Sequence, residues 1–194
     1  ATYNAQHLPL TTAGADGQTT TNTYNARGQL LTTSNPKGET TAYTYNTNGS
    51  LLTVNGPRTN VSDVTTYTYY PNDDPEPSKR GNVASITNAA GHVTSITAYN
   101  AHGQPLTIVD ANGLTTILTY DQRQRLTSRT VGTETTSYEY DGAGQLIKIT
   151  LPDGSFLSYT YDAAHRLTGM QDSLGNRIAY TLDAMGNRTQ EEVR

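Results

Sequence analysis

The chain has 194 residues, a formal net charge of −4, no cysteine, and 14 tyrosines against one phenylalanine and no tryptophan. The mild, evenly spread charge argues against nucleic acid as a partner, because binding phosphates needs a basic face. The lack of cysteine excludes disulfides and cysteine-ligated metal sites. No stretch is apolar and long enough to span a membrane, and no signal peptide is recognisable.

A tyrosine followed by Asn or Asp returns along the chain at nearly constant intervals. From Tyr3 the steps are 21, 21, 24, 30, 21, 20, 21 and 21 residues, the last one reaching a degenerate copy at Leu182. A fixed period near 20 residues indicates an array of one small supersecondary unit. We therefore interpret the tyrosines as structural repeat anchors: Tyr3, Tyr24, Tyr45, Tyr69, Tyr99, Tyr120, Tyr140 and Tyr161.

One period contains two turns and two strands. Asn25–Gly28 and Asn35–Gly38 each place Asn first and Gly fourth, the preference of a type I turn. The segments 29–34 and 39–45 between turns are rich in Thr, Leu and Tyr, which favours antiparallel strands. The turn glycines predicted in this way are Gly17, Gly28, Gly38, Gly49, Gly81, Gly91, Gly103, Gly113, Gly144, Gly154, Gly175 and Gly186.

Two copies of the unit are stretched. Residues 55–63 lengthen one turn, and residues 70–80 carry three prolines, which forbid a ladder strand and predict a surface loop at a hairpin tip. Eight units imply about sixteen strands, more than a flat open sheet usually holds. We therefore predict an all-β fold in which repeated antiparallel hairpins of about 21 residues wind into a spiral sheet.

Residues 1–194 are predicted to form one repeat array. Ala1 lies two residues before an anchor and Arg194 falls within a unit, while repeat arrays normally end in atypical capping units. We expect the chain to be an interior fragment of a larger shell. Its cut ends would leave strand edges exposed, which predicts self-association.

The pattern Tyr-[Asp/Asn]-x-x-Gly-x-Leu, cleanest at residues 140–146, resembles the YD repeat of Rhs polymorphic toxins, Tc toxin B and C subunits, and teneurins. Gln124 and His165 replace the turn glycine in two copies. The resemblance implies a hollow cocoon that encloses polypeptide, often a toxic C-terminal domain. It also implies a secreted protein, or one delivered by a bacterial secretion system, at the cell envelope or outside the cell.

Residues that could carry chemistry have simpler explanations. His7, His102 and His165 fall in first turns, and His92 follows a second-turn glycine, so we interpret all four as solvated turn residues. Asp73, Asp74 and Glu76 form the one compact acidic cluster, which a stiff exposed loop explains better than a Ca²⁺ site. We therefore predict no catalytic residue, no metal site, no cofactor and no enzyme activity.

Two functions follow as hypotheses. The first is a structural wall that, with the remainder of the parent shell, encloses a toxin or effector domain before delivery to a target cell. The alternative is a carbohydrate- or receptor-binding module of a secreted or cell-surface protein, in which tyrosine faces stack on glycans. Pairs such as Tyr43 with Tyr45 favour packing instead, because aromatic residues two apart share one face of a strand.

Overall fold

The computed structural model describes residues 1–194 as 18 β-strands and no helix. The predicted all-β fold of antiparallel hairpins is confirmed. The chain divides into two compact units: unit 1 is residues 1–104 with 109–113, and unit 2 is residues 105–108 with 114–194. The prediction of a single array over residues 1–194 stays a prediction.

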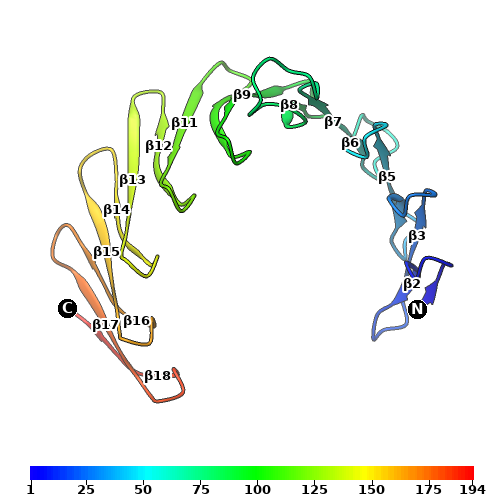
Figure 1. The fold of residues 1–194 in the computed structure, drawn as a ribbon. Helices are drawn as coiled ribbons and strands as arrows, with labels where there is room; N and C mark the ends of the chain where they lie inside the picture. The colour runs from blue at the N-terminus through cyan, green and yellow to red at the C-terminus, as the bar shows by residue number, and fades with distance from the viewer. The chain divides into compact units, whose positions relative to one another are not determined.

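Unit 1 contains the first nine strands, drawn from blue to green in Figure 1. Each strand pairs with the next one along the chain, and every pairing is antiparallel. The strands are β1 (Thr2–Tyr3), β2 (Pro9–Ala13), β3 (Thr19–Tyr24), β4 (Leu30–Ser34), β5 (Thr40–Tyr45), β6 (Leu51–Asn55), β7 (Val64–Tyr69), β8 (Val83–Thr87) and β9 (Val93–Tyr99).

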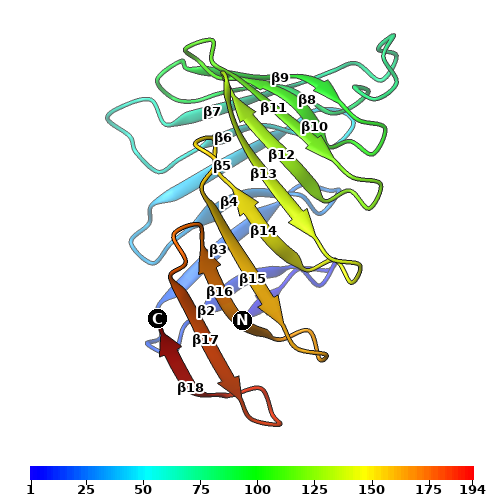
Figure 2. The same cartoon turned by 90° about the vertical axis from the view of Figure 1, so that its left-hand side faces the viewer.

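Unit 2 repeats this arrangement, and Figure 2 shows its hairpins side by side, with successive connections at opposite edges of the sheet. Its strands are β11 (Thr115–Tyr120), β12 (Leu126–Val131), β13 (Glu134–Tyr140), β14 (Leu146–Thr150), β15 (Phe156–Tyr161), β16 (Leu167–Asp172), β17 (Arg177–Leu182) and β18 (Arg188–Val193). Strand β10 (Pro105–Val109) contributes residues to both units.

The eight units inferred from the sequence account for β2 to β17. Of the two further strands, β1 ends at the first anchor, Tyr3, and β18 follows the degenerate copy at Leu182. The interval from Tyr120 to Tyr140 is 20 residues rather than the usual 21, and the structure shows the reason. Val131 pairs directly with Glu134, so only two residues connect β12 to β13, and Gly132 has φ 59°. Such primed two-residue turns match the twist of a hairpin.

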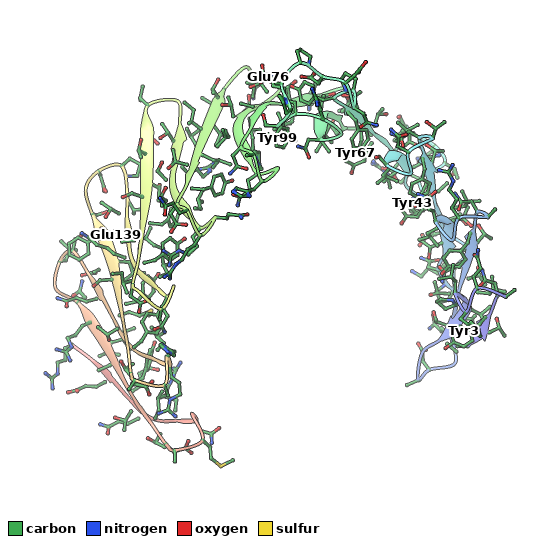
Figure 3. All side chains as sticks on the ribbon, viewed as in Figure 1. Tyr3, Tyr43, Tyr67, Glu76, Tyr99 and Glu139 are labelled. Carbon is green, nitrogen blue, oxygen red and sulfur yellow. The ribbon has the colours of Figure 1, made fainter.

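The sheet has little buried core. Tyr99 is the one apolar side chain that is buried, at 8% exposed, and no side chain is fully buried. Each face is instead held by local contacts. On one face, hydroxyls of neighbouring strands bond to each other, as in Thr23–Thr32 (2.6 Å) and Thr44–Thr53 (2.7 Å). The tyrosines lie on the other face, where Figure 3 shows Tyr43 and Tyr67 on the same side of unit 1.

Candidate functional site: the first-turn edge

The connections that follow the anchor tyrosines all lie at one edge of the sheet in each unit, which we call the first-turn edge. The alternate connections form the second-turn edge. Every predicted anchor is the last residue of a strand: Tyr3 ends β1, Tyr24 β3, Tyr45 β5, Tyr69 β7, Tyr99 β9, Tyr120 β11, Tyr140 β13 and Tyr161 β15. The motif that dominates the sequence therefore marks where each strand enters its first turn.

The anchor hydroxyls have a defined partner that the sequence does not reveal. Seven of the eight anchors, those after Tyr3, donate to the backbone carbonyl of the residue that opens the preceding strand, in both units. The bonds run from Tyr24 to Pro9 (3.0 Å), Tyr45 to Leu30 (2.8 Å), Tyr69 to Leu51 (2.7 Å), Tyr99 to Val83 (2.7 Å), Tyr120 to Pro105 (3.1 Å), Tyr140 to Leu126 (2.9 Å) and Tyr161 to Leu146 (2.8 Å). Tyrosine thus supplies a link between strands that phenylalanine could not.

The Asn or Asp after each anchor shapes the turn with its side chain. Asn25 Oδ1 accepts hydrogen bonds from the backbone N–H groups of Arg27 (2.9 Å) and Gln29 (3.0 Å). In unit 2, Asp121 Oδ1 accepts from Arg123 (2.8 Å) and Arg125 (3.0 Å) in the same way. These are Asx turns, which explains why short polar residues occupy the slot.

The fourth turn position needs a left-handed backbone. All twelve predicted turn glycines have positive φ, between 70° and 98°. His7, Gln124 and His165 take the same position with φ between 59° and 64°. The turn closes with Gly28 N–H donating to Asn25 O (3.0 Å), and a β-bulge lies between Thr23 and Tyr24. A type I turn followed by a residue at positive φ is the usual three-residue hairpin loop.

The first turns are also bonded to one another, one repeat to the next. Polar side chains at the third or fifth turn position reach a backbone carbonyl in the following first turn, about 20 residues on. The bonds join Gln6 to Ala26 (3.1 Å), Arg27 to Thr47 (2.6 Å), Gln29 to Gly49 (2.8 Å), Arg123 to Gly142 (2.8 Å), Gln145 to His165 (2.9 Å) and Arg166 to Asp183 (2.9 Å). Sequence reasoning missed these residues, although a polar residue follows four places after every Asx from Asn25 onward.

The turn glycines at the two edges have different surroundings. A Cβ added at any first-turn glycine would lie 3.3–3.7 Å from a neighbouring side chain. At five of these positions that side chain belongs to the preceding first turn or its flanking strand, whereas Gly81 meets Asn72 of its own loop. At the second-turn edge, a Cβ at Gly132 would lie 3.5 Å from Leu114 Cδ1, but at six other glycines it would meet nothing within 4 Å; these are Gly17, Gly38, Gly91, Gly113, Gly154 and Gly175. The first-turn edge is therefore packed repeat against repeat, whereas the second-turn edge is open at most of its turns.

Partial burial affects the titration of several anchors. Burial is the main cause that raises the pKa of Tyr45, and the nearby Tyr43 phenol adds to it. Burial also raises the pKa of Tyr69, Tyr99 and Tyr161. A raised pKa keeps these phenols protonated to a higher pH than an exposed tyrosine, so each O–H continues to donate its hydrogen bond in mildly alkaline solution.

The loop of residues 70–80 contains no strand, as the prolines predict. It is nevertheless attached to the sheet. The Tyr70 hydroxyl donates to Ile96 O in β9 (2.9 Å), and its ring meets Tyr99 edge-on at 6.5 Å between centroids. Lys79 Nζ lies 5.3 Å from the centre of the Tyr70 ring. The insertion thus covers the most buried tyrosine of the molecule.

The candidate chemical residues do not form a site. No group of three or more His, Cys, Asp or Glu side chains is placed to hold a metal ion. Asp74 instead accepts the Glu76 backbone N–H (2.9 Å) within the loop. His165 Nδ1 lies 2.9 Å from Gln145 Oε1, and so takes part in the contact between first turns. A depression of about 180 Å³ lies over Gly169 between Thr160 and Arg177.

The fold and the arrangement of its turns are those of a β-hairpin repeat protein. Each repeat contains two antiparallel strands, and an anchor tyrosine ends one of them. The chain belongs to the RHS repeat family, which matches residues 3–40, 24–61, 99–136, 130–155, 140–177 and 161–193. The unmatched residues 62–98 contain the attached loop.

Solved structures share this fold. The complex described as TcdB2-TccC3-Cdc42 matches with a TM-score of 0.59 and 20% identity, over 97% of this chain and 12% of that one. The Photorhabdus luminescens Tc holotoxin pore, with a mutated TccC3, matches with a TM-score of 0.58 and 21% identity over the same shares. The chain thus spans about an eighth of the length of these matched chains. No curated protein is significantly similar in sequence. The structure has no helix that could cross a membrane.

Proposed function

We propose that this chain is a segment of the wall of an RHS-type shell that, with the remainder of the parent shell, encloses a toxin or effector polypeptide before its delivery to a target cell. The observation that carries the proposal is the first-turn edge, where side chains bond successive repeats from Tyr3 to Tyr45 in unit 1 and from Tyr120 to Leu182 in unit 2. Such bonds make a continuous surface from units that could not bury a core alone.

The comparisons support this proposal through fold and family. An RHS repeat that matches Tc toxin chains over 97% of its length is suited to the same architectural role. The residues that recur are used in folding, and we assign no reaction and no cofactor to the segment. A shell with this role would act in a secreted protein or one delivered by a bacterial secretion system.

Proteolysis of the full-length protein that carries this segment tests the proposal. One cleavage site for a sequence-specific protease is placed in the C-terminal polypeptide, and the same site is placed in the exposed loop at Pro75 as a control for access. Enclosure predicts cleavage of the loop site and protection of the C-terminal site until the shell is unfolded. Equal cleavage rates at both sites in the folded protein would contradict it.

The carbohydrate- or receptor-binding alternative has less support. Seven anchor hydroxyls already donate to the backbone, which removes the groups that would orient a sugar. A glycan array distinguishes the two functions. Glycan binding by the unmodified chain that is lost in the Tyr67→Ala variant would favour the alternative. If the unmodified chain binds no glycan, the result favours the shell wall.

A further inference from the structure

An asparagine directly precedes a glycine at three places, all of them in unit 1: Asn48-Gly49, Asn55-Gly56 and Asn112-Gly113. In such a pair the backbone nitrogen of the glycine can attack the side-chain carbonyl carbon of the asparagine and close a cyclic imide. Glycine allows the approach because it has no Cβ beside its nitrogen. All three asparagines are exposed, so burial alone does not decide which of them reacts.

The attacking nitrogen is engaged in every case. Each glycine N–H donates a hydrogen bond to a backbone carbonyl, and the bonds run from Gly49 to Asn46 (3.0 Å), Gly56 to Asp63 (2.9 Å) and Gly113 to Asp110 (3.0 Å). Attack requires this bond to break and the peptide to turn. The rate in the folded chain therefore depends on the free energy of opening the backbone locally, which differs from site to site.

The turn that holds Asn48 is tied to the preceding first turn. Arg27 donates to Thr47 O (2.6 Å) and Gln29 donates to Gly49 O (2.8 Å), so the carbonyls on both sides of Asn48 are fixed. Opening this turn breaks both bonds in addition to its own. We therefore expect Asn48 to be protected.

Asn55 is held by the sheet itself. It ends β6 and is paired on both sides, with Ala42 in β5 and Val64 in β7. The Asp63 carboxylate fills the space beside Gly56, where an added Cβ would collide with it. Moving the Gly56 nitrogen toward the Asn55 side chain thus disturbs two strand pairings, and this asparagine should also be protected.

Asn112 lies outside the strands, at the third position of the second turn Asp110–Gly113 between β10 and β11. Gly113 is exposed, and a Cβ built on it would meet nothing within 4 Å. The peptide between Asn112 and Gly113 can therefore reorient without displacing a neighbouring side chain. Of the three pairs, this one needs the smallest opening.

We propose that Asn112 is a site of spontaneous deamidation, and that the fold protects Asn48 and Asn55. The Gly113 nitrogen bonds to Asn112 Cγ and gives up its proton, and the side-chain nitrogen leaves as ammonia. Water then opens the imide at one of its two carbonyl carbons. One product is aspartate at residue 112, and the other is isoaspartate, in which the main chain runs through Cγ. Water is the only co-reactant, and no atom changes its oxidation state.

The two products should affect the turn differently. Aspartate already occupies the same position in two other second turns, at Asp16 in unit 1 and Asp153 in unit 2, so this product fits the fold. Isoaspartate adds a main-chain atom to a turn whose length is fixed, and it should weaken that turn. Either product adds a negative charge at the second-turn edge. The inference concerns this chain alone and does not depend on the proposed shell.

Incubation of the chain in mildly alkaline buffer, followed by peptide mapping with mass spectrometry, measures the rate at each asparagine. The folded chain should deamidate at Asn112 roughly tenfold faster than at Asn48 or Asn55, because local opening is easier there. In urea the three rates should become similar, since every Asn-Gly pair is then freely mobile. Equal rates in the folded chain, or reaction at Asn112 only after unfolding, would overturn the inference. So would an equal preference for Asn112 in urea, which would place its cause in the sequence.

A double variant tests the protection of Asn48 directly. Arg27→Ala with Gln29→Ala removes both bonds from the preceding turn. Deamidation at Asn48 should then rise several-fold, while the rate at Asn112 stays the same.

The matched control is Arg123→Ala with Gln145→Ala, which removes bonds of the same kind in unit 2 and should leave the rate at Asn48 unchanged. Circular dichroism checks that both double variants are folded. An Asn48 rate that the first variant leaves unchanged, or that both variants raise equally, would contradict protection by the preceding turn.

Discussion

The first turns of unit 1 and unit 2 have the same geometry but different chemistry. In unit 1 the residue after the anchor is an amide at Asn4, Asn25, Asn46 and Asn100, and Tyr70 in the copy with the inserted loop, whereas in unit 2 it is an acid at Asp121, Asp141, Asp162 and Asp183. At two of the acidic turns, those of Asp121 and Asp162, the side chain four residues later is an arginine. Asn25 Nδ2 donates to Gln29 Oε1 (2.9 Å), and Asp121 forms an ion pair with Arg125 (2.6 Å).

This difference separates what the turn requires from what it tolerates. An oxygen that accepts two backbone N–H groups is present in both units, so the acceptor is the requirement. The charge is an addition made in unit 2 alone. Because only a carboxyl group can be protonated, the two units should respond differently to acid.

The largest expected effect is selective loss of unit 2 stability at low pH. Hydrogen bonds from the Arg125 backbone and side chain lower the pKa of Asp121, and the Arg166 backbone N–H is the main cause that lowers the pKa of Asp162. Asp153, Asp172 and Asp183 of unit 2 also have lowered pKa values, and so does Asp63 of unit 1, which is bonded to Arg58.

A carboxyl group with a lowered folded pKa stabilises the protein above its unfolded pKa, near 4, and that stability disappears as the pH falls through the folded value. Limited proteolysis between pH 6 and pH 2 should therefore cut unit 2 before unit 1. The triple variant Asp121→Asn, Asp162→Asn and Asp183→Asn should reduce the difference. Loss of both units at one pH, unchanged by the variant, would contradict this explanation.

The left-handed turn position should be equally demanding in both units. Gly28→Ala and Gly144→Ala force a Cβ into φ of 80° and 98°, which should cost about 1–2 kcal/mol each in free energy of unfolding. The surroundings are also alike, since the added Cβ would lie 3.3 Å from Leu8 Cδ1 at Gly28 and 3.4 Å from Arg125 Nη1 at Gly144. Gly142→Ala is the control, because Gly142 has open space and no positive φ. Urea unfolding measures all three.

The anchor hydroxyl should likewise contribute equally in the two units. Tyr45→Phe and Tyr120→Phe each remove one hydrogen bond to a backbone carbonyl, with an expected cost of about 0.5–1.5 kcal/mol. Tyr43→Phe is the control in the same strand, because the Tyr43 hydroxyl donates no hydrogen bond. Thermal unfolding that shows the same loss for all three variants would mean that the hydroxyl bond contributes nothing.

The smallest effect should come from replacing one charged pair of unit 2 by neutral residues. Converting Asp121 and Arg125 to Asn and Gln gives unit 2 the chemistry of unit 1, and partly exposed ion pairs contribute about 1 kcal/mol or less. In 1 M salt the variant and the unmodified chain should unfold at nearly the same urea concentration, because screening removes most of the difference between them. A large loss that persists at high salt would show that the ion pair is part of the fold.

Much of this architecture is predictable from the sequence because the turns are specified locally. Asn25, Pro36 and Gly38 each favour one turn position by their own covalent structure. The antiparallel pairing then follows from short connections. The partners of Arg27 and Gln29 in the next turn are not predictable, because many polar residues at a surface have no fixed partner.

The role of the loop at residues 70–80 was only half predictable. Prolines show that it is not a strand, but nothing in the sequence indicates that Tyr70 covers Tyr99. That contact depends on how the loop folds back over β8 to reach β9, which is decided by tertiary packing. The division of the chain into two units is similarly invisible in a period that continues through both.

Amide hydrogen exchange at Gln29 and Arg125 tests the common turn most directly. Both N–H groups donate to the Asx oxygen of their turn, at 3.0 Å in each unit. After correction for intrinsic rates, we predict similar protection at pH 6, and below pH 4 a loss at Arg125 with none at Gln29. Unequal protection at pH 6, or parallel loss at both residues in acid, would contradict the view that one turn is built with two chemistries.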